Sequence, residues 1–579
     1  MNKRTLNFGA LLTGLLALTY WSWKQLKFSP ISPTTIHLTL DNAVESLDPV
    51  RAYSDDSLVV SAQVLEPLYQ YHYLKRPYEI QPLLAEANPL IEREGTLYKI
   101  KIKKGIFFHD HPAFKGKSRE LMADDFVIQF KRLAMESLKS PGRSLFTGLI
   151  EGFDDYGKLI GEDWTKLNTY PLKGVEARDR WTLIISLKKP EPNLIYYLSL
   201  NFISPVPFEL VEHFKNDLSD SMIGTGPYVY RGFNGKFFEM QKFLGYREDY
   251  YPTSGDRYAN VQKLLVSSKE KIPFIDTVRF YVTQEDERWE KFLNHEIDLL
   301  SVPKTFIPRL YNSDGGLATE LRKQDLRLKH FPILANRWYS FNMRHPVFGK
   351  NKNLRLAVAY AIDYTKYIQV ISQNTNLRAN SLLVPGIAGY RPTEDLRFRY
   401  DPNLAKEYLK KAGFSDPSKL PEIVYSTRGT QAIHLMEAEF IKEHLEAIGF
   451  KVKIEVLPFS DFLKKGRAGE LMFFTDNWLF DYPDGENILQ LLISSNSPGI
   501  NKSGYSNAKM DALYMELKRT TNLERREKIF KDMETQVFED LPWIPMMYES
   551  SFVLHYPEIK NFRKSSIIRN YIKYLKIEN

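Results

Sequence analysis

Two carboxylates, Asp481 and Asp484, stand in one short aromatic stretch, WLFDYPDG at 478–485. The aromatic neighbours of Asp481 can keep water away from it, and a partly dehydrated carboxylate is suited to binding a cationic group. Two carboxylates also supply the acid and the base of many hydrolases. Alternatively, the loop rests on core aromatic residues and has no chemical role. The residue types alone leave these three interpretations open.

The other candidate side chains do not form a catalytic or metal-binding pattern. His109 and His111 lie close together in a turn-like stretch, but zinc sites need three or four ligands. His434 and His444 lack the i, i+4 spacing of a helical metal pair. The chain has no cysteine, which excludes disulfides, thiolate metal sites and a cysteine nucleophile. The sequence therefore predicts no metal, no cofactor and no catalytic residue.

Two further motifs are predicted to be structural. The glycine-rich stretch GTGPY at 224–228 contains Pro227, which lacks the backbone N–H that a phosphate-binding loop needs. We expect a turn there. Asp124 and Asp125 are adjacent, so on a helix they point to different faces, and we expect them to begin a helix. The chain also lacks a nucleophile elbow, a Walker-type phosphate loop and a dinucleotide fingerprint.

Strand and helix signals alternate along the chain, which is typical of α/β domains. In the stretch 401–413, Asp401 is a candidate N-cap, Pro402 suits the first turn and Gly413 ends the helix. A second helix, containing Ile433 and Ile448, is predicted to end at Gly449. The predicted strands are 35–40, 97–103, 181–187, 276–282 and 451–457, and a further helix is predicted at 285–295.

Length and composition favour a large soluble protein that has either more than one domain or one multi-lobed body. The chain has 579 residues, 43% of them hydrophobic and 13% aromatic, which suits concave sites lined by flat side chains. The net charge of +8 is spread among interspersed acidic residues. Such a distribution does not mark a nucleic-acid groove, so we expect no nucleic-acid partner.

The amino-terminal segment at 1–33 is predicted to direct export. Lys3 and Arg4 precede a mostly apolar run at 6–23, and lysines follow it. No small-residue cleavage site follows the run, whose length is near the lower limit for a membrane span. The segment is therefore either a signal peptide or an uncleaved anchor that tethers a periplasmic protein to the inner membrane. A Ser/Pro-rich linker ends it at about residue 33.

Several short motifs follow one another along nearly the whole exported body. They are 45–49 (ESLDP), 64–68 (VLEPL), 106–109 (IFFH), 123–126 (ADDF), 224–228 (GTGPY), 341–344 (FNMR), 355–363 (RLAVAYAID), 478–487 (WLFDYPDGEN) and 541–545 (LPWIP). Together and in this order they resemble the family 5 extracellular solute-binding proteins, which comprise the dipeptide, oligopeptide and nickel receptors of ABC importers. Two positions depart from the family pattern: His111 stands where glycine is usual, and Gly485 replaces a proline.

The resemblance implies an α/β, periplasmic-binding-protein-like fold of the large three-lobed type (class II). Two main lobes are joined by a hinge and close around the ligand, and an extra lobe is added. Laid onto this chain, the family pattern puts lobe I at 34–66, 171–282 and 549–579. Lobe II would be 67–170 and lobe III 283–548.

The resemblance also implies a site. In peptide-binding members the motif aspartate, here Asp481, pairs with the ammonium group of the ligand. Trp478 and Phe480 would form the adjacent wall, and backbone groups near Leu479 would pair with the peptide as an added strand. Tyr53 corresponds to a ligand contact in the first lobe. The expected partners are a peptide and the permease subunits of an ABC transporter, and the expected state is a monomer.

Alternatives remain within and outside this family. The same scaffold also serves receptors for nickel chelates, haem, opines or oligosaccharides. A membrane-anchored hydrolase would use Asp481 and Asp484 as acid and base, although one short loop supplies both groups and no activated nucleophile accompanies them. A receptor that signals to another membrane protein without transport is a third alternative.

Overall fold

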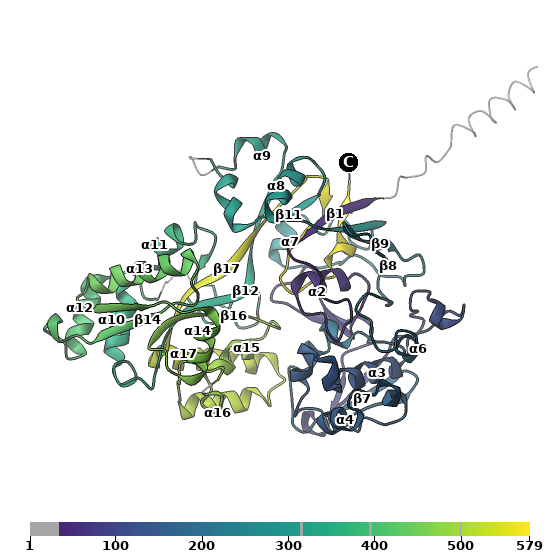
Figure 1. Cartoon of the computed structure of the whole chain (residues 1–579), viewed down its shortest axis with the longest axis horizontal. Helices are drawn as coiled ribbons and strands as arrows, with labels where there is room; N and C mark the ends of the chain where they lie inside the picture. The colour runs from purple at the N-terminus through teal and green to yellow at the C-terminus, as the bar shows by residue number, and fades with distance from the viewer. Residues whose placement is uncertain (1–33, 313–315, 393–396, 498, 579) are drawn as a thin grey trace, which may run out of the picture.

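The computed structural model describes residues 34–312, 316–392, 397–497 and 499–578 (Figure 1). The predicted export segment and its linker at 1–33 lie outside the described residues. Within the described ranges, no helix combines the length and the apolar composition that crossing a bilayer requires.

The first sheet has the strand order β1-β10-β9-β8 and begins with the predicted alternating segment. Strand β1 (Thr35–Leu40) buries Ile36, Leu38 and Leu40, whereas its other side chains are only partly buried. It runs parallel to β10 (Thr277–Val282), which is distant in the sequence. The sheet is completed by β9 (Phe237–Lys242) and β8 (Tyr228–Phe233).

The second sheet, β4-β5-β7-β6, combines two separate parts of the chain. Helices α3 (Ala123–Ala134) and α4 (Phe153–Ile160) belong to the same body, and α3 contacts β6 and β7. The sheet joins residues 175–186 to residues 90–101, although the family pattern assigns these segments to different lobes. Its strands are β4 (Leu90–Glu92), β5 (Leu97–Lys101), β7 (Thr182–Ser186) and β6 (Val175–Asp179).

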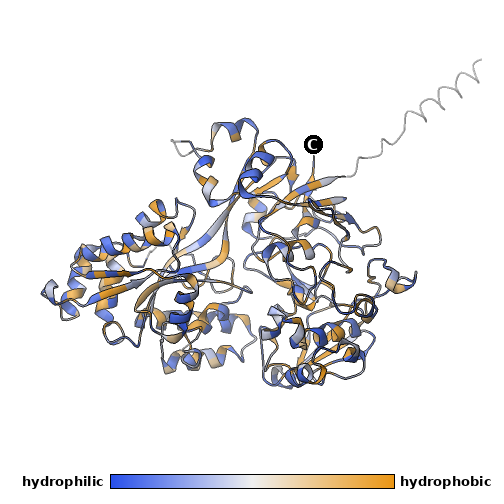
Figure 2. Ribbon diagram, viewed as in Figure 1, coloured by the Kyte–Doolittle hydropathy of each residue, from blue (hydrophilic) through white to orange (hydrophobic). Residues whose placement is uncertain are grey.

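The third sheet has seven strands, six of them in the order β11-β17-β12-β16-β14-β15. Helices line it on the left of Figure 1, and their ribbons carry both apolar and hydrophilic residues, as expected for helices with one buried face (Figure 2). The strands are β11 (Leu299–Ser301), β17 (Trp543–His555), β12 (Arg327–Phe341), β16 (Phe473–Leu479), β14 (Glu422–Ser426) and β15 (Lys451–Glu455), and β13 (Leu377–Arg378) pairs with β17. The main helices are α10 (Lys352–Ala361), α12 (Pro402–Lys411), α13 (Ala432–Glu446), α16 (Ala508–Leu517) and α17 (Leu523–Asp540).

Strands β12 and β17 connect the helical body to the rest of the molecule. Both are long, and they run from the helical body on the left to the centre of Figure 1. Their antiparallel pairing is interrupted between Pro332 and Asn336, where the register shifts. Such an irregularity bends a strand pair. The boundary at 548/549 in the predicted division falls inside β17.

The local predictions that rest on capping and periodicity are confirmed. The Asp401 side chain accepts hydrogen bonds from the N–H groups of Asn403 and Leu404, and Gly413 has a φ of +95°. Asp124 and Asp125 lie in the first turn of α3. The GTGPY stretch is a bend at residues 225–227 that leads into β8, and a Cβ atom on Gly224 would lie 2.1 Å from the carbonyl oxygen of Val64. Only glycine permits this close approach.

Candidate ligand-binding site

Asn487 organises the loop that carries Asp481. The loop follows β16, and Asn487 lies in the short helix α15 (Glu486–Leu489) that comes after it. The Asn487 side-chain oxygen accepts hydrogen bonds from Trp478 Nε1 at 2.7 Å and from the Asp481 N–H at 3.2 Å. Asn487 Nδ2 donates to Asp481 Oδ2 at 3.4 Å. One amide therefore fixes the indole, the backbone and the carboxylate relative to one another.

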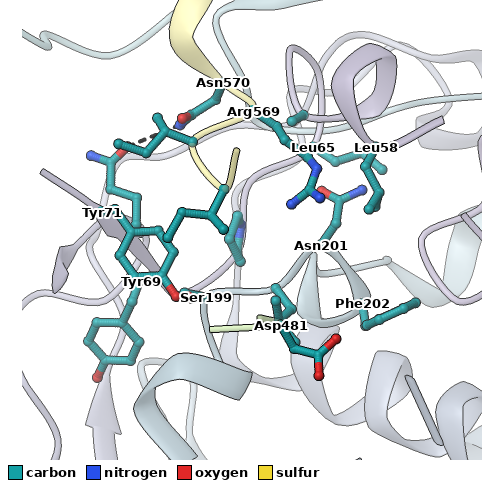
Figure 3. Close-up of a pocket in the computed structure, with 16 residues that line it drawn as sticks. Leu58, Leu65, Tyr69, Tyr71, Ser199, Asn201, Phe202, Asp481, Arg569 and Asn570 are labelled. Carbon is teal, nitrogen blue, oxygen red and sulfur yellow. Dashed lines mark hydrogen bonds between the residues drawn. The ribbon is translucent and has the colours of Figure 1, made fainter. Parts of the chain in front are cut away.

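Asp481 lines a cavity of about 80 Å³, where its loop meets the body that contains the first sheet. This volume holds several water molecules. Figure 3 shows Asp481 near Phe202, with Arg569 and Asn570 on another side of the cavity. Six lining residues from five separate segments are Leu58, Tyr69, Tyr71, Asn201, Asp481 and Arg569.

The Asp481 carboxylate has the electrostatic character of a cation-binding group. Burial raises its pKa above the ordinary aspartate value, while the hydrogen bond from Asn487 and the charge of Arg569 oppose this shift. Arg569 already donates to Asp55 at 2.6 Å. Within the described part of the chain, Asp481 forms no ion pair of 4.0 Å or less. A cation placed here would gain a charge-assisted hydrogen bond.

Asp484, the second carboxylate of the loop, is structural. It is buried, and Asp484 Oδ1 accepts hydrogen bonds from Arg526 Nη2 at 2.7 Å and from the Glu486 N–H at 2.9 Å. Arg526 Nη2 also donates to Asn193 Oδ1 at 3.1 Å. Because Asp484 does not line the Asp481 cavity and is paired with Arg526, the two carboxylates do not share one reaction space.

The loop also docks against the body that contains the second sheet. The Tyr482 ring stacks on Tyr196 of α5 (Leu194–Tyr197), with ring centroids 5.8 Å apart. Tyr482 donates a hydrogen bond to Glu486, and Asn193 Nδ2 donates to the same carboxylate oxygen at 3.1 Å. The position of Asp481 is therefore set by contacts with two bodies.

One edge of β16 is only partly paired with a neighbouring strand. β12 pairs with all seven residues of β16, from Phe473 to Leu479. On its other edge, β14 pairs only with Phe473 and Phe474. No strand within the described ranges pairs with this edge from Thr475 to Leu479. An extended peptide can bind such an edge through backbone hydrogen bonds.

The other predicted site residues are placed differently from one another. Trp478 is partly buried, and its indole shares the hydrogen-bond acceptor Asn487 with the Asp481 backbone. Leu479 is 57% exposed at the end of β16. Phe480 is only 3% exposed and belongs to a core cluster, so its side chain packs in the core and anchors the loop there. Tyr53 is 60% exposed and does not line the Asp481 cavity.

Sequence reasoning missed most of the cavity wall. Arg569 lies near the carboxyl end of the chain, Asn201 in an aromatic stretch after the second sheet, and Tyr69 and Tyr71 on a short strand. None of these residues has a local signal, because they become neighbours of Asp481 only through tertiary structure. The motif aspartate was the one position that a sequence pattern could find.

The histidines serve structural contacts. His109 is buried, and one ring nitrogen lies 2.9 Å from the carbonyl oxygen of Gly226. Burial lowers the pKa of His109 to about 4, so its ring is neutral at physiological pH. His111 caps a short turn by accepting a hydrogen bond from the Ala113 N–H. Among the described residues, no three histidine or acidic side chains cluster in a way that would hold a metal ion.

Comparison with solved structures defines the class of fold. The structure of HbpA2 from Haemophilus parasuis superposes with a TM-score of 0.77 over 94% of this chain and 100% of that chain, at 19% identity. The fold is therefore periplasmic-binding-protein-like, as predicted. The chain belongs to the bacterial extracellular solute-binding proteins, family 5, whose family model matches residues 79–499. This match confirms the family resemblance.

Two curated relatives align over most of their length. The chain is 26% identical to the heme-binding protein A of Haemophilus influenzae over 515 residues, which is 87% of this chain and 85% of the relative. It is 25% identical to the di/tripeptide-binding protein 2 of Pseudomonas aeruginosa over 544 residues, which is 92% of this chain and 93% of the relative.

Proposed function

We propose that this chain is an exported receptor that binds a peptide between its lobes and delivers it to the permease of an ABC importer. The observation that carries the proposal is the Asp481 carboxylate, which lines an inter-body cavity and has no ion-pair partner within the described part of the chain. The partly unpaired edge of β16 supports a peptide in particular, because an edge offers backbone partners along an extended ligand.

In this proposal, Asp481 binds the ligand ammonium group, while Trp478 and the backbone near Leu479 form the adjoining wall. The protein acts as a monomer. It carries out no catalysis, because Asp484 is paired with Arg526 and leaves Asp481 without a second group for acid–base chemistry. The amino-terminal segment exports the protein, either as a cleaved signal or as a tether to the inner membrane. Fractionation with intact-mass measurement distinguishes the two forms.

The strand pairing supports a revised division of the chain into lobes. We assign residues 175–186 to lobe II, because they complete its sheet, and all of β17 to lobe III. Limited proteolysis followed by mass mapping tests this division, since cleavage should fall between the bodies and spare both sheets.

Ligands released by denaturing protein purified from its native compartment provide the test. Mass spectrometry should find intact peptides with free amino termini, and these peptides should remain intact after prolonged incubation with fresh protein. Protein that yields only non-peptide solutes, or that cleaves the peptides, would contradict the proposal.

Haem is the second candidate ligand, because one relative is described as a heme-binding protein. The residues described around the Asp481 cavity include no histidine or methionine, but Tyr69 and Tyr71 are candidate iron ligands, so the preference for a peptide rests on Asp481 and the partly unpaired edge of β16. Titration with haemin, followed by its Soret absorbance, compares the two candidates directly. We expect no saturable spectral change.

A further inference from the structure

A second cavity, of about 290 Å³, lies beside the start of β12 and shares no lining residue with the Asp481 cavity. Its volume is close to the lower end of the range found for small-molecule sites, roughly 300–1,000 Å³. Five segments form its walls: β12 at 329–332, the stretch 562–564 after β17, the loop at 76–78, the region of α7 (Arg257–Val261) and the loop at 385–386.

Positive charge dominates the lining of this cavity. Arg563 forms a two-point ion pair with Asp256, in which Nη2 and Oδ2 are 2.6 Å apart. Asp256 is the only carboxylate among the described lining residues. Lys564 also lies near Asp41 and Asp55, which belong to a neighbouring cavity. The cationic lining residues are Arg76, Lys329, Arg563 and Lys564.

Arg76 has donor capacity that the described residues leave unused. Its Nη1 donates to the carbonyl oxygens of Tyr73 and Lys75, and its guanidinium lies 3.9 Å from the centre of the Tyr78 ring. Its Nη2 is buried and has no hydrogen-bond partner among the described residues. Burial lowers the pKa of Arg76, while Tyr78 and the Asp256 carboxylate oppose this shift. A buried donor without a partner is costly, so an anion that reaches Nη2 would be stabilised.

The remaining walls are flat and apolar. Phe331 and Pro332 come from β12, Tyr78 from the loop at 76–78, Tyr258 from α7, and Phe562 from the stretch after β17. We infer that this cavity binds a small organic anion that carries a flat apolar group, such as an aromatic carboxylate. The anionic group pairs with Arg76 and Lys329, and the apolar group contacts the aromatic walls.

Calorimetric titration of the full-length protein with 2-naphthoate tests this inference, with the neutral 2-naphthalenemethanol as a matched probe. We expect saturable binding of 2-naphthoate and at least tenfold weaker binding of the alcohol. Arg76→Gln should weaken 2-naphthoate binding at least tenfold, which corresponds to about 1.4 kcal/mol. Arg178→Gln, an exposed change of the same charge on β6, should leave it unchanged.

Lys329→Gln changes a second cationic lining residue and tests the anion site if Arg76→Gln does not fold. It should also weaken binding severalfold. Wild-type protein that binds no 2-naphthoate at concentrations up to about 5 mM would overturn the inference. Equal affinities in wild type and the folded cavity variants would also overturn it. Loss of binding in Arg569→Gln would place the anion in the Asp481 cavity, whose cationic lining residue is Arg569, and this result is independent of whether peptides bind there.

Discussion

Arg526 and Asp484 form an ion pair of 2.7 Å in which both side chains are almost completely buried, with 6% and 4% of their surfaces exposed. Arg526 lies on α17, and Asp484 lies in the loop that presents Asp481. The second carboxylate of the motif therefore anchors the loop, whereas the first carboxylate, Asp481, has no ion-pair partner within the described part of the chain.

Asp484→Asn should lower the free energy of unfolding by about 3–5 kcal/mol, because it leaves the Arg526 charge buried without a counter-ion. Urea denaturation followed by circular dichroism measures this loss. Asp532→Asn is the matched control on α17, since Asp532 pairs with Lys528 at the surface, and it should cost less than about 1 kcal/mol. Equal effects of the two substitutions would show that the buried pair does not hold the loop.

Asn487→Ala should weaken peptide binding by roughly tenfold, because the Trp478 indole and the Asp481 backbone lose their common hydrogen-bond acceptor. Calorimetry with one peptide compares this variant with wild type. Gln490→Ala is the control, because it removes only a hydrogen bond to the Asn487 carbonyl oxygen and leaves the Asn487 side-chain amide in place, and it should change the affinity less than twofold. An unchanged affinity in a folded Asn487→Ala protein would contradict the role of Asn487.

Peptide affinity should fall as the pH is lowered, because only the ionised Asp481 pairs with an ammonium group. Burial raises the pKa of this carboxyl in the ligand-free protein, so the loss should begin at a higher pH than an ordinary aspartate would give. Asn487→Ala removes a bond that lowers this pKa and should move the midpoint to still higher pH. Affinities measured across a pH series provide the test, and Asp481→Ala should show no such midpoint.

Local structure was largely predictable from the sequence. The helix after Asp401 and the strand β1 have strong signals, because capping and alternation are properties of neighbouring residues. The pairing of β1 with β10, or of β5 with β7, has no local signal, since the paired strands are distant in the sequence.

The site was predictable only at its motif. The motif singles out Asp481 as a candidate, whose role stays a prediction, but the positions of Arg526 and Arg569 depend on segments that the fold brings to the loop from elsewhere in the chain. Phe480 illustrates a further limit, because alternation along a strand end does not reveal which side chain faces the core and which faces the ligand. The ligand contact assigned to Tyr53 stays a prediction.

The recognition of a free amino terminus by Asp481 is tested most directly by titrating one co-purified peptide and its N-acetylated form into wild type and Asp481→Ala. Acetylation should weaken binding to wild type by roughly two to three decades, about 3–5 kcal/mol, and should hardly affect Asp481→Ala. If both peptides bind wild type equally well, Asp481 does not bind the ligand amine and the proposed peptide site is wrong.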